Sequence, residues 1–393
     1  SCTDCLRIFS SELCYECTDC LKCHTCAWSQ NCQNCSDCLM CRDCIGCKNC
    51  IGCIGLRNAE YCIYNKKLSK KEYFEQSKKL QKQSRKELDK NLEYAKQQHL
   101  KHPRKQNHTV NCENSTSDYL TNAKDCRSCF DSSDIQDCHY CCNINNQAKD
   151  CYDYEVWGEN AELIYDSITC GENANRILFS ESCWAQVHDL LYCTFCMHSS
   201  FLFGCTSLKG NQYCILNKQY TEREYNELVP KIIAHMRKTG EWGAFFPASA
   251  SPFGYNETLA QEFSPLSQKE VQERGWKWHE EEDGKNQYLG PDYEVPDTIE
   301  QVDDDILNQI LRCEVSGKPY KLIPQELKFY REQNYPIPKK CPDQRHLERM
   351  ALRNPRKLFD RTCGKCSKPM QTTYSPDRPE AVYCETCYQE TVY

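Results

Sequence analysis

The stretch Cys14–Cys53, CYECTDCLKCHTCAWSQNCQNCSDCLMCRDCIGCKNCIGC, has a cysteine at every third position except Ser29. A period of three matches neither the 3.6-residue helix nor the two-residue strand, so the thiols could not share one face of either. Collagen also repeats in threes, but it needs Gly at the repeat position. We therefore expect a narrow β-solenoid with three-residue sides, one inward residue per side, and a coil of about 12 residues.

The end of this stretch is repeated later in the chain. Residues 52–76 read GCIGLRNAEYCIYNKKLSKKEYFEQ, and residues 204–228 read GCTSLKGNQYCILNKQYTEREYNEL. Each copy predicts a last strand (Tyr61–Tyr64 or Tyr213–Leu216) followed by a helix. Ser69 with Glu72, and Thr221 with Glu224, have the spacing of a capping box. We expect each helix to cap the end of its solenoid, where strand edges would otherwise be unpaired.

These patterns divide the chain into five segments. We expect a first cysteine-rich β-solenoid over 1–65, a basic helical cap and connector over 66–108, a second β-solenoid over 109–217, a helical cap with an aromatic docking segment and an acidic linker over 218–310, and a zinc-ribbon tail domain over 311–393. Within the connector, residues 70–101 are predicted to form one long helix. The three histidines of the connector, His99, His102 and His108, are expected to be solvated. The predicted fold class is mainly β.

The strongest candidate site lies near the C-terminus. Two CxxC pairs, Cys363 with Cys366 and Cys384 with Cys387, stand on either side of a short spacer. Four thiolates from two such knuckles form a tetrahedron that suits structural Zn²⁺ and leaves no open position for a substrate. The surrounding segment lacks a large apolar core, so bound zinc would supply folding free energy. A pair of disulfides is the alternative.

A second, incomplete pair of knuckles precedes this site. Cys313-Glu-Val-Ser316 and Cys341-Pro-Asp-Gln344 have the same layout, with Ser and Gln in place of the second cysteine of each knuckle. Two thiolates alone hold zinc poorly. We expect a metal-free copy that packs like its neighbour.

Basic residues lie between the two pairs of knuckles. Arg345, Arg349 and Arg353 share one face of a predicted helix, and Arg356 and Lys357 follow. A basic helix beside a zinc ribbon can hold a phosphate backbone, which makes these five residues a candidate nucleic-acid site. The alternative is a connector whose charges pair with the acidic stretch 269–308.

The remaining cysteines do not indicate thiol–disulfide catalysis, because they share one inward phase and no exposed thiol is singled out. A dry thiol core, disulfides across the lumen and metal loading stay open as alternatives. The chain has 393 residues and 35 cysteines, and an odd number excludes complete pairing. Since secreted cysteine-rich scaffolds are usually much shorter, we expect a reduced or metal-bound state inside the cell.

Motifs of the common enzyme classes are missing from the sequence. We find no GxGxxG, GxxxxGK[ST], HExxH or nucleophile elbow, and no small-molecule substrate is evident. No apolar run is long enough for a transmembrane helix, and no signal peptide is visible. The sequence therefore predicts a protein that is not an enzyme and does not associate with membranes.

Taken together, the motifs resemble an uncharacterised family of cysteine-rich-repeat proteins from uncultured small-genome bacteria and large DNA viruses. The resemblance rests on segments along nearly the whole chain, namely 213–225 (YCILNKQYTEREY), 240–258 (GEWGAFFPASASPFGYNET), 326–331 (ELKFYR), 342–349 (PDQRHLER), 352–358 (LRNPRKL) and the final CxxC pairs. It implies zinc binding and no defined activity.

We therefore predict a non-enzymatic structural or interaction scaffold with a structural zinc site, within a larger particle such as a virion or ribonucleoprotein. A protein partner or assembly is the expected partner, and the expected location is intracellular (cytoplasmic) or inside such a particle. A nucleic-acid-binding zinc-ribbon protein and a thiol-rich metal store are the alternative functions.

Overall fold

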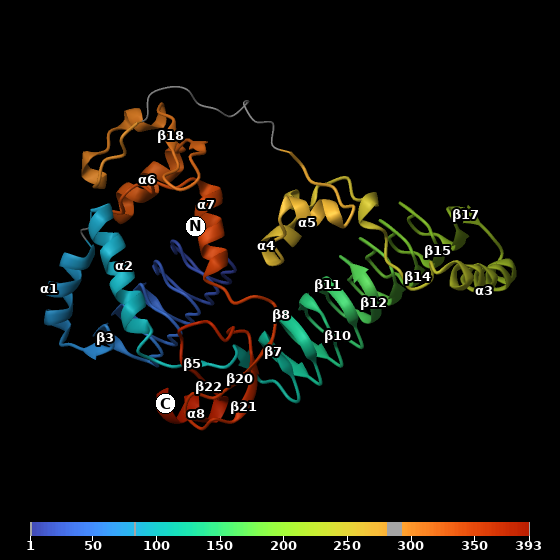
Figure 1. Ribbon diagram of the computed structural model, residues 1–393, viewed down its shortest axis with the longest axis horizontal. Coiled ribbons are helices and arrows are strands. Elements are labelled where there is room, and N and C mark those ends of the chain that lie inside the picture. The colour runs from blue at the N-terminus through green and yellow to red at the C-terminus, as the bar shows by residue number, and fades with distance from the viewer. Residues whose placement is uncertain (1, 82–83, 281–292, 393) are drawn as a thin grey trace.

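The computed structural model describes residues 2–81, 84–280 and 293–392, and the fold is mainly β. Two stacks of short parallel strands lie side by side, with helices at their ends (Figure 1). The C-terminal tail returns to the junction of the two stacks. None of the helices described is both long and apolar enough to cross a membrane.

The first stack (residues 2–67) consists of coils whose residues pair in parallel. Thr3 pairs with Tyr15 and Tyr15 with Ala27, a register of 12 residues per coil. Four of its sides are regular enough to count as strands: β1 (Ser36–Leu39), β2 (Lys48–Ile51), β3 (Glu60–Ile63) and the antiparallel β4 (Lys66–Lys67). The strand predicted over Tyr61–Tyr64 is therefore observed one residue earlier.

Left-handed residues turn the corners between the sides. Asp4, Arg7, Ser10 and Leu13, each three residues after the last, have φ of 51°, 51°, 49° and 52°. L-residues rarely adopt this conformation, and Asp, Asn and Gly tolerate it best. Corner positions in the first stack are accordingly rich in Asp and Asn, and backbone hydrogen bonds between coils offset the remaining strain.

The cysteines of the first stack form its interior. Cys14, Cys26, Cys38 and Cys50 belong to successive coils and are at most 1% exposed. Their thiols donate to backbone carbonyl oxygens of the same coil and, in most cases, of the next one. Where Ser29 interrupts the series, its hydroxyl accepts from the Cys41 N–H and donates to the Ala27 carbonyl oxygen. All the cysteines are free thiols.

The second stack (residues 109–219) repeats this arrangement with a more aliphatic interior. Its strands are β6 (Thr109–Val110), β7 (Thr116–Lys124), β8 (Arg127–Gln136), β9 (Cys142–Asn145), β10 (Ala148–Lys149), β11 (Tyr152–Gly158), β12 (Glu162–Ile168), β13 (Asn175–Leu178), β14 (His188–Leu191), β15 (Ser200–Phe203), β16 (Gln212–Ile215) and the antiparallel β17 (Lys218–Gln219). Strands β8, β9, β11, β12 and β10 close a ring of parallel pairs.

Three coil lengths occur in the second stack, the shortest being 11 residues where Thr109 pairs with Leu120. Ile164 pairs with Ile177, a coil of 13 residues, whereas Leu202 pairs with Cys214, a coil of 12. The longer coils have two consecutive left-handed residues at one corner, such as Glu172 and Asn173. The extra residue therefore extends a corner and leaves the inward positions in register.

Helices cover the last strand of each stack. The helix α1 (Lys70–Gln81) contacts β3, and α3 (Glu222–Thr239) contacts β16. Both predicted capping boxes are confirmed by hydrogen bonds between Ser69 and Glu72, and between Thr221 and Glu224.

The single helix predicted over 70–101 is wrong. A second helix, α2 (Arg85–His99), begins at Ser84, whose side chain and Glu87 form another capping box. Residues 82–83 lie outside the described part of the chain. Because a capping box satisfies the free N–H groups of a new helix, the sequence Ser84–Glu87 favours a fresh start there. Helix α2 is also partly buried, because Leu88 and Ala95 are shielded from solvent.

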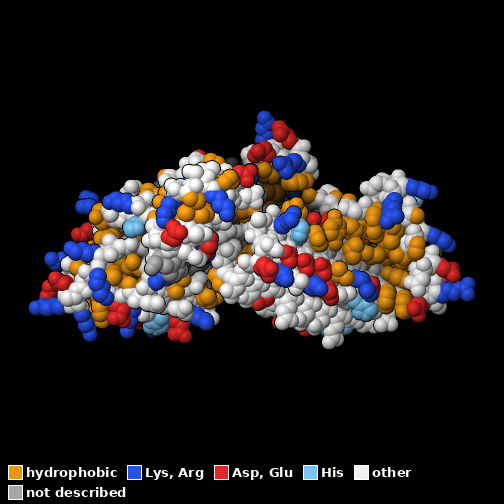
Figure 2. Space-filling model, turned by 90° about the horizontal axis from the view of Figure 1, so that it is seen from below, with side chains coloured by type: hydrophobic (Ala, Val, Ile, Leu, Met, Phe, Trp, Pro, Cys, Tyr) orange, Lys and Arg blue, Asp and Glu red, His pale blue; other side chains and the backbone are white. Residues whose placement is uncertain are grey.

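The aromatic segment that follows α3 contacts the second stack. Trp242 packs against Phe179 and Tyr192, with ring centroids 5.7 and 5.9 Å apart. Short helices follow: η1 (Ala248–Ala250), η2 (Tyr255–Glu257), α4 (Leu259–Phe263) and α5 (Gln268–Glu273). Part of the predicted acidic linker, residues 281–292, lies outside the described residues. Hydrophobic side chains also gather on the exposed surface of the lobe that contains the second stack (Figure 2).

The tail begins on the first stack and ends at the junction. Its elements are η3 (Ile299–Gln301), η4 (Asp304–Leu307), β18 (Leu311–Arg312), β19 (Pro319–Tyr320), α6 (Pro324–Gln333), α7 (Pro342–Ala351), β20 (Phe359–Thr362), β21 (Pro369–Thr372), β22 (Val382–Tyr383) and α8 (Glu385–Val392). An outward row of the first stack, which includes Tyr15, Leu39 and Ile51, packs into one apolar cluster with Leu88 and Tyr330.

Candidate metal centre and the junction of the two stacks

The four C-terminal cysteines are presented by two knuckles. Cys363 follows β20, and Cys384 lies between β22 and α8. In the first knuckle the Cys363 N–H donates to the Lys368 carbonyl oxygen, and the Ser367 N–H donates to the Cys363 carbonyl oxygen, both at 2.9 Å. Ser367 adopts φ of 58°, which turns the chain back into β21.

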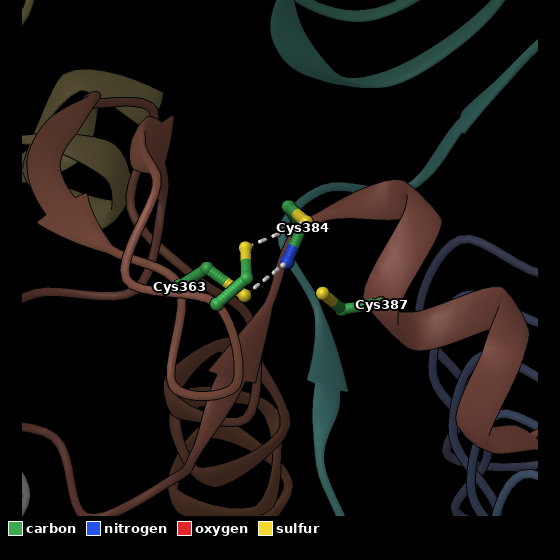
Figure 3. Close-up of side chains that lie close together, drawn as sticks. Cys363, Cys384 and Cys387 are labelled. Carbon is green, nitrogen blue, oxygen red and sulfur yellow. Dashed lines mark hydrogen bonds between the residues drawn. The ribbon is translucent and has the colours of Figure 1, made fainter.

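The knuckles bring the four sulfur atoms of Cys363, Cys366, Cys384 and Cys387 within 4.8 Å of one another (Figure 3). The sulfur atoms of Cys366 and Cys384 are 3.8 Å apart. A tetrahedral ion with metal–sulfur bonds of about 2.3 Å requires sulfur–sulfur edges of about 3.8 Å. The four cysteines predicted as ligands therefore form a group that could hold a metal ion.

Backbone donors favour a thiolate at Cys363. Burial alone would raise its pKa, but N–H groups of Lys365 and Cys384 point at its sulfur at 3.5 and 3.3 Å, and together with Cys366 they lower the pKa of Cys363 to about 6. Burial and the neighbouring thiols raise the pKa of Cys387 to about 12. Cys363 is therefore more readily deprotonated than Cys387, and a bound divalent cation would stabilise the thiolate form of the ligands.

The metal centre is attached to the connector between the stacks. Strand β22 pairs in parallel with β5 (Arg104–Lys105), and Lys105 forms an ion pair of 2.7 Å with Glu385 of α8. Thr372 donates to the Gln106 carbonyl oxygen, and Thr373 donates to Asp118 of the second stack. The position of the metal centre is therefore coupled to the position of both stacks.

The incomplete knuckles fold like the complete ones. The Cys313 N–H donates to the Lys318 carbonyl oxygen and the Gly317 N–H to the Cys313 carbonyl oxygen, both at 2.9 Å as at Cys363. The Ser316 hydroxyl lies 3.7 Å from the Cys341 sulfur, which corresponds to the Cys366–Cys384 contact. Gln344 instead donates to Glu348 at 3.2 Å. Among the described residues, this region forms no group of three or more metal ligands.

The arginines predicted as a phosphate-binding face are not exposed. Arg345, Arg349 and Arg353 are 4%, 6% and 8% exposed, so an open basic surface is absent from this face of α7. Arg345 and Arg349 share one face of α7, as predicted, but α7 ends at Ala351 and Arg353 follows it. All three arginines lie against corner carboxylates of the first stack. Arg345 bonds Asp4, and Arg349 bonds Glu16 at 2.9 Å.

The segment after α7 extends these ion pairs to the second stack. Arg353 bonds Asp19 of the first stack at 2.9 Å and also Asp131 of the second stack. Arg356 bonds Asp131 at 3.0 Å and Glu155 at 3.1 Å. Burial would raise the pKa of Asp131, but Arg353 and Arg7 lower it. Lys357 alone of the five predicted residues is exposed.

The predicted pairing of these arginines with the acidic stretch 269–308 is also wrong within the described residues. Most of their partners are corner residues of the coils, and the others are Glu326 of α6 and Glu155 of β11. The sequence patterns assigned no role to Asp4, Glu16, Asp19 and Asp131. Their location on corners that face α7 was the available signal, but it becomes visible only once the stacks are placed.

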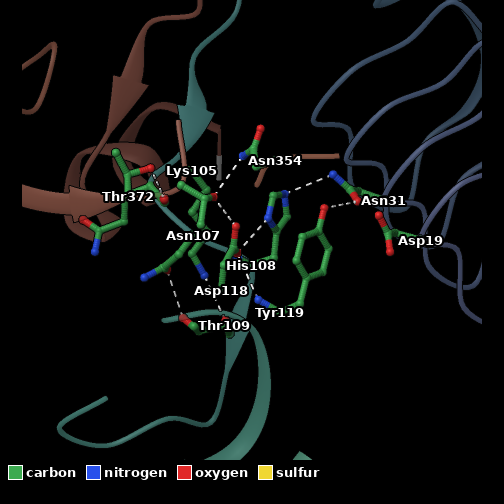
Figure 4. A network of polar contacts seen from close by, with 12 residues as sticks. Asp19, Asn31, Lys105, Asn107, His108, Thr109, Asp118, Tyr119, Asn354 and Thr372 are labelled. Carbon is green, nitrogen blue, oxygen red and sulfur yellow. Dashed lines mark hydrogen bonds and ion pairs between the residues drawn. The ribbon is translucent and has the colours of Figure 1, made fainter. Parts of the chain in front are cut away.

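A second polar network joins the stacks at His108 (Figure 4). The His108 ring lies 3.0 Å from Asp118 and 3.0 Å from the Asn31 amide, and Tyr119 donates to the Asn31 side chain at 3.0 Å. Although burial alone would lower it, the carboxylates of Asp118 and Asp43 raise the pKa of His108 well above its ordinary value. The prediction that His108 is solvated is therefore wrong.

His99 is buried as well, 3.2 Å from the Gly52 carbonyl oxygen, and burial lowers its pKa to about 4. Of the three connector histidines, only His102 is largely exposed. His99 and His108 each contact a stack, which a solvated connector would not do.

The chain matches no protein-family model, and comparisons with curated proteins and with solved structures gave no match. The family resemblance drawn from the sequence motifs therefore stays a prediction.

Proposed function

We propose that this protein is a non-enzymatic structural and interaction scaffold. In this proposal the two stacks are β-solenoids with helical caps, and a zinc-ribbon tail holds them at a fixed angle. The observation that carries the proposal is Arg353, which bonds Asp19 of the first stack and Asp131 of the second stack while it belongs to the tail. A tail that packed on only one stack would not form buried ion pairs with both stacks.

Zinc is the metal that the four cysteines suit best. Sulfur ligands favour soft or borderline cations, and four thiolates at tetrahedral spacing are typical of structural zinc. A site with four protein ligands has no position left for a substrate. The ion would then stabilise the tail and, through β22 and β5, the junction.

The interior thiols support an inert core in preference to a metal store. Most of the first-stack cysteines are at most 3% exposed, and their thiols donate to backbone carbonyl groups. Within the described ranges, no other group of three or more candidate ligands meets the geometry of the C-terminal four. Core thiols of this kind pack as small hydrophobic groups.

The test combines metal content, free thiols and small-angle scattering on full-length protein purified without chelator. We expect one zinc per chain, mostly free thiols, and larger molecular dimensions once a strong chelator removes the zinc. Several metal ions per chain would favour a thiol-rich store. Unchanged dimensions after zinc removal would contradict the role of the tail in holding the angle.

A further inference from the structure

A cleft of about 730 Å³ lies between the two stacks. Corner residues of both stacks line its floor, including Asp19, Asn31 and Tyr119, which Figure 4 shows beside His108. Tyr388 of α8 lines one part of it. Because the walls belong to different stacks, the cleft exists only while the tail and the junction hold the stacks together.

One wall of the cleft is largely apolar. Phe9, Leu21 and Ile45 belong to a single row that rises by one coil at a time, with Gln33 between Leu21 and Ile45. Phe9 is 57% exposed and Leu21 is 37% exposed. A row of this kind covers three coil steps of about 4.8 Å each, about 14 Å in all.

The opposite wall offers hydroxyl and amide groups. Thr121 and Ser133 are register partners on β7 and β8, and the Ser133 hydroxyl donates to the Asn145 side chain at 3.2 Å. These groups lie at the same coil spacing as the apolar row. A ligand along the cleft would therefore meet an apolar surface on one side and repeated neutral hydrogen-bonding groups on the other.

The charges of the cleft argue against an anionic ligand. Its lining contains five carboxylates (Asp19, Asp43, Asp131, Asp134 and Glu385) against three Lys and Arg side chains. The deepest carboxylates already have partners, since Asp131 pairs with Arg353 and Asp43 lies near His108. Lys105 pairs with Glu385 and His108 with Asp118, so the lining offers a phosphate backbone no excess of positive charge.

The backbone of the apolar wall is not available to add a peptide strand. The N–H groups of Leu21, Gln33 and Ile45 donate to the next coil at 2.9–3.0 Å. Strand addition requires a free sheet edge, whereas this wall is a sheet face. Recognition must therefore come from side chains.

We propose that the cleft binds a neutral oligosaccharide chain. A hexose ring has an apolar face of C–H groups, which would stack on Phe9 and lie along Leu21 and Ile45, and a rim of hydroxyl groups, which would bond Gln33, Thr121, Ser133 and Asn145. The repeat of the two walls suits a linear chain of a few sugar units. The inference rests on the proposed scaffold function, because the two walls belong to different stacks and must be held at a fixed separation.

The test uses full-length, zinc-loaded protein and a panel of soluble neutral oligosaccharides built from glucose, xylose, mannose or N-acetylglucosamine. Saturation-transfer NMR identifies the sugar that binds, and calorimetry measures its affinity. We expect one class of the panel to bind, and Phe9→Ala and Gln33→Ala each to weaken it by about tenfold. Phe195→Ala is the matched control, because Phe195 is 51% exposed on the second stack and does not line the cleft.

Three results would overturn the inference. These are no binding by any member of the panel at millimolar concentration, an affinity of the Phe9→Ala and Gln33→Ala variants that equals that of the native protein, or capture of a peptide or polyanion in place of the sugars. Small-angle scattering on the same samples measures whether the two stacks are still held together. It therefore distinguishes a failure of the oligosaccharide proposal from a failure of the scaffold proposal. Absent binding with unchanged dimensions would reject the oligosaccharide and leave the scaffold standing. Absent binding with enlarged dimensions would mean that the two walls are not held.

Discussion

The two pairs of knuckles in the tail have the same backbone and are stabilised differently. At Cys363 the four sulfur atoms converge, and the apolar cluster that contains Cys313 and Cys341 does not include this region. At Cys313 two ligand positions are Ser316 and Gln344, and the region belongs to an apolar cluster that includes Leu311, Tyr330 and Ile337. From this difference we infer that the small hairpin fold is stabilised either by a metal ion or by an apolar core, because a segment of this size buries too little surface to be stable alone.

The largest effect should follow loss of a ligand from the complete knuckles. Cys384→Ser would remove the metal, whose binding free energy is on the order of 10 kcal/mol in sites of this type. Cys341→Ser is the matched change in the metal-free knuckles and should leave the zinc content at one per chain. Metal analysis after gel filtration measures both. Equal zinc content in the two variants would contradict the assignment.

The reverse change should convert the metal-free knuckles into a second site. Ser316→Cys combined with Gln344→Cys would restore four thiols where the backbone already matches that at Cys363. We expect the zinc content to rise from one to two per chain, because ligand number and not backbone geometry is missing. A content that stays at one would show that the apolar packing around Tyr330 prevents the sulfur atoms from converging.

The next largest effect should follow a change at Arg353, in the segment between the two pairs of knuckles. Arg353→Met would leave Asp19 and Asp131 with fewer partners in a buried site, and we expect a loss of about 3 kcal/mol in the free energy of unfolding. Lys357→Met, at an exposed position, should change it by about 0.5 kcal/mol or less. Urea unfolding measures both values. Similar losses in the two variants would mean that the Arg353 pairs do not hold the stacks together.

A smaller, pH-dependent effect should arise at His108, on the side of the Cys363 knuckles. The pKa of His108 is raised in the folded state, so its contribution to stability is fully present below about pH 6.5 and is lost as the pH rises through the folded pKa. The difference in urea midpoint between the native protein and His108→Gln should therefore shrink as the pH rises from about 6 to about 9. A constant difference would show that His108 does not titrate in this range.

Local features of the fold were predictable to within a residue or so. The capping boxes at Ser69 and Thr221 lie where the sequence indicates, and β3 and β16 begin one residue before the predicted strands. The helix break at Ser84 was missed because the apolar positions continue across it. The sequence predicts a coil of about 12 residues, and the coils of 13 differ from it by one extra left-handed residue, such as Asn173, which extends a corner and leaves the inward pattern unchanged.

The sequence by itself determined the local chemistry of this protein. The three-residue period placed the cysteines inside each coil, and each CxxC spacing placed two thiols on one knuckle, because these positions are only a few residues apart along the chain. Only the tertiary structure decided what the arginines of α7 and the corner carboxylates do. Arg345 and Asp4 lie at opposite ends of the chain, and their pairing depends on how the tail packs across the stacks. A repeated local pattern carries no information about such a contact, since it is the same at every coil.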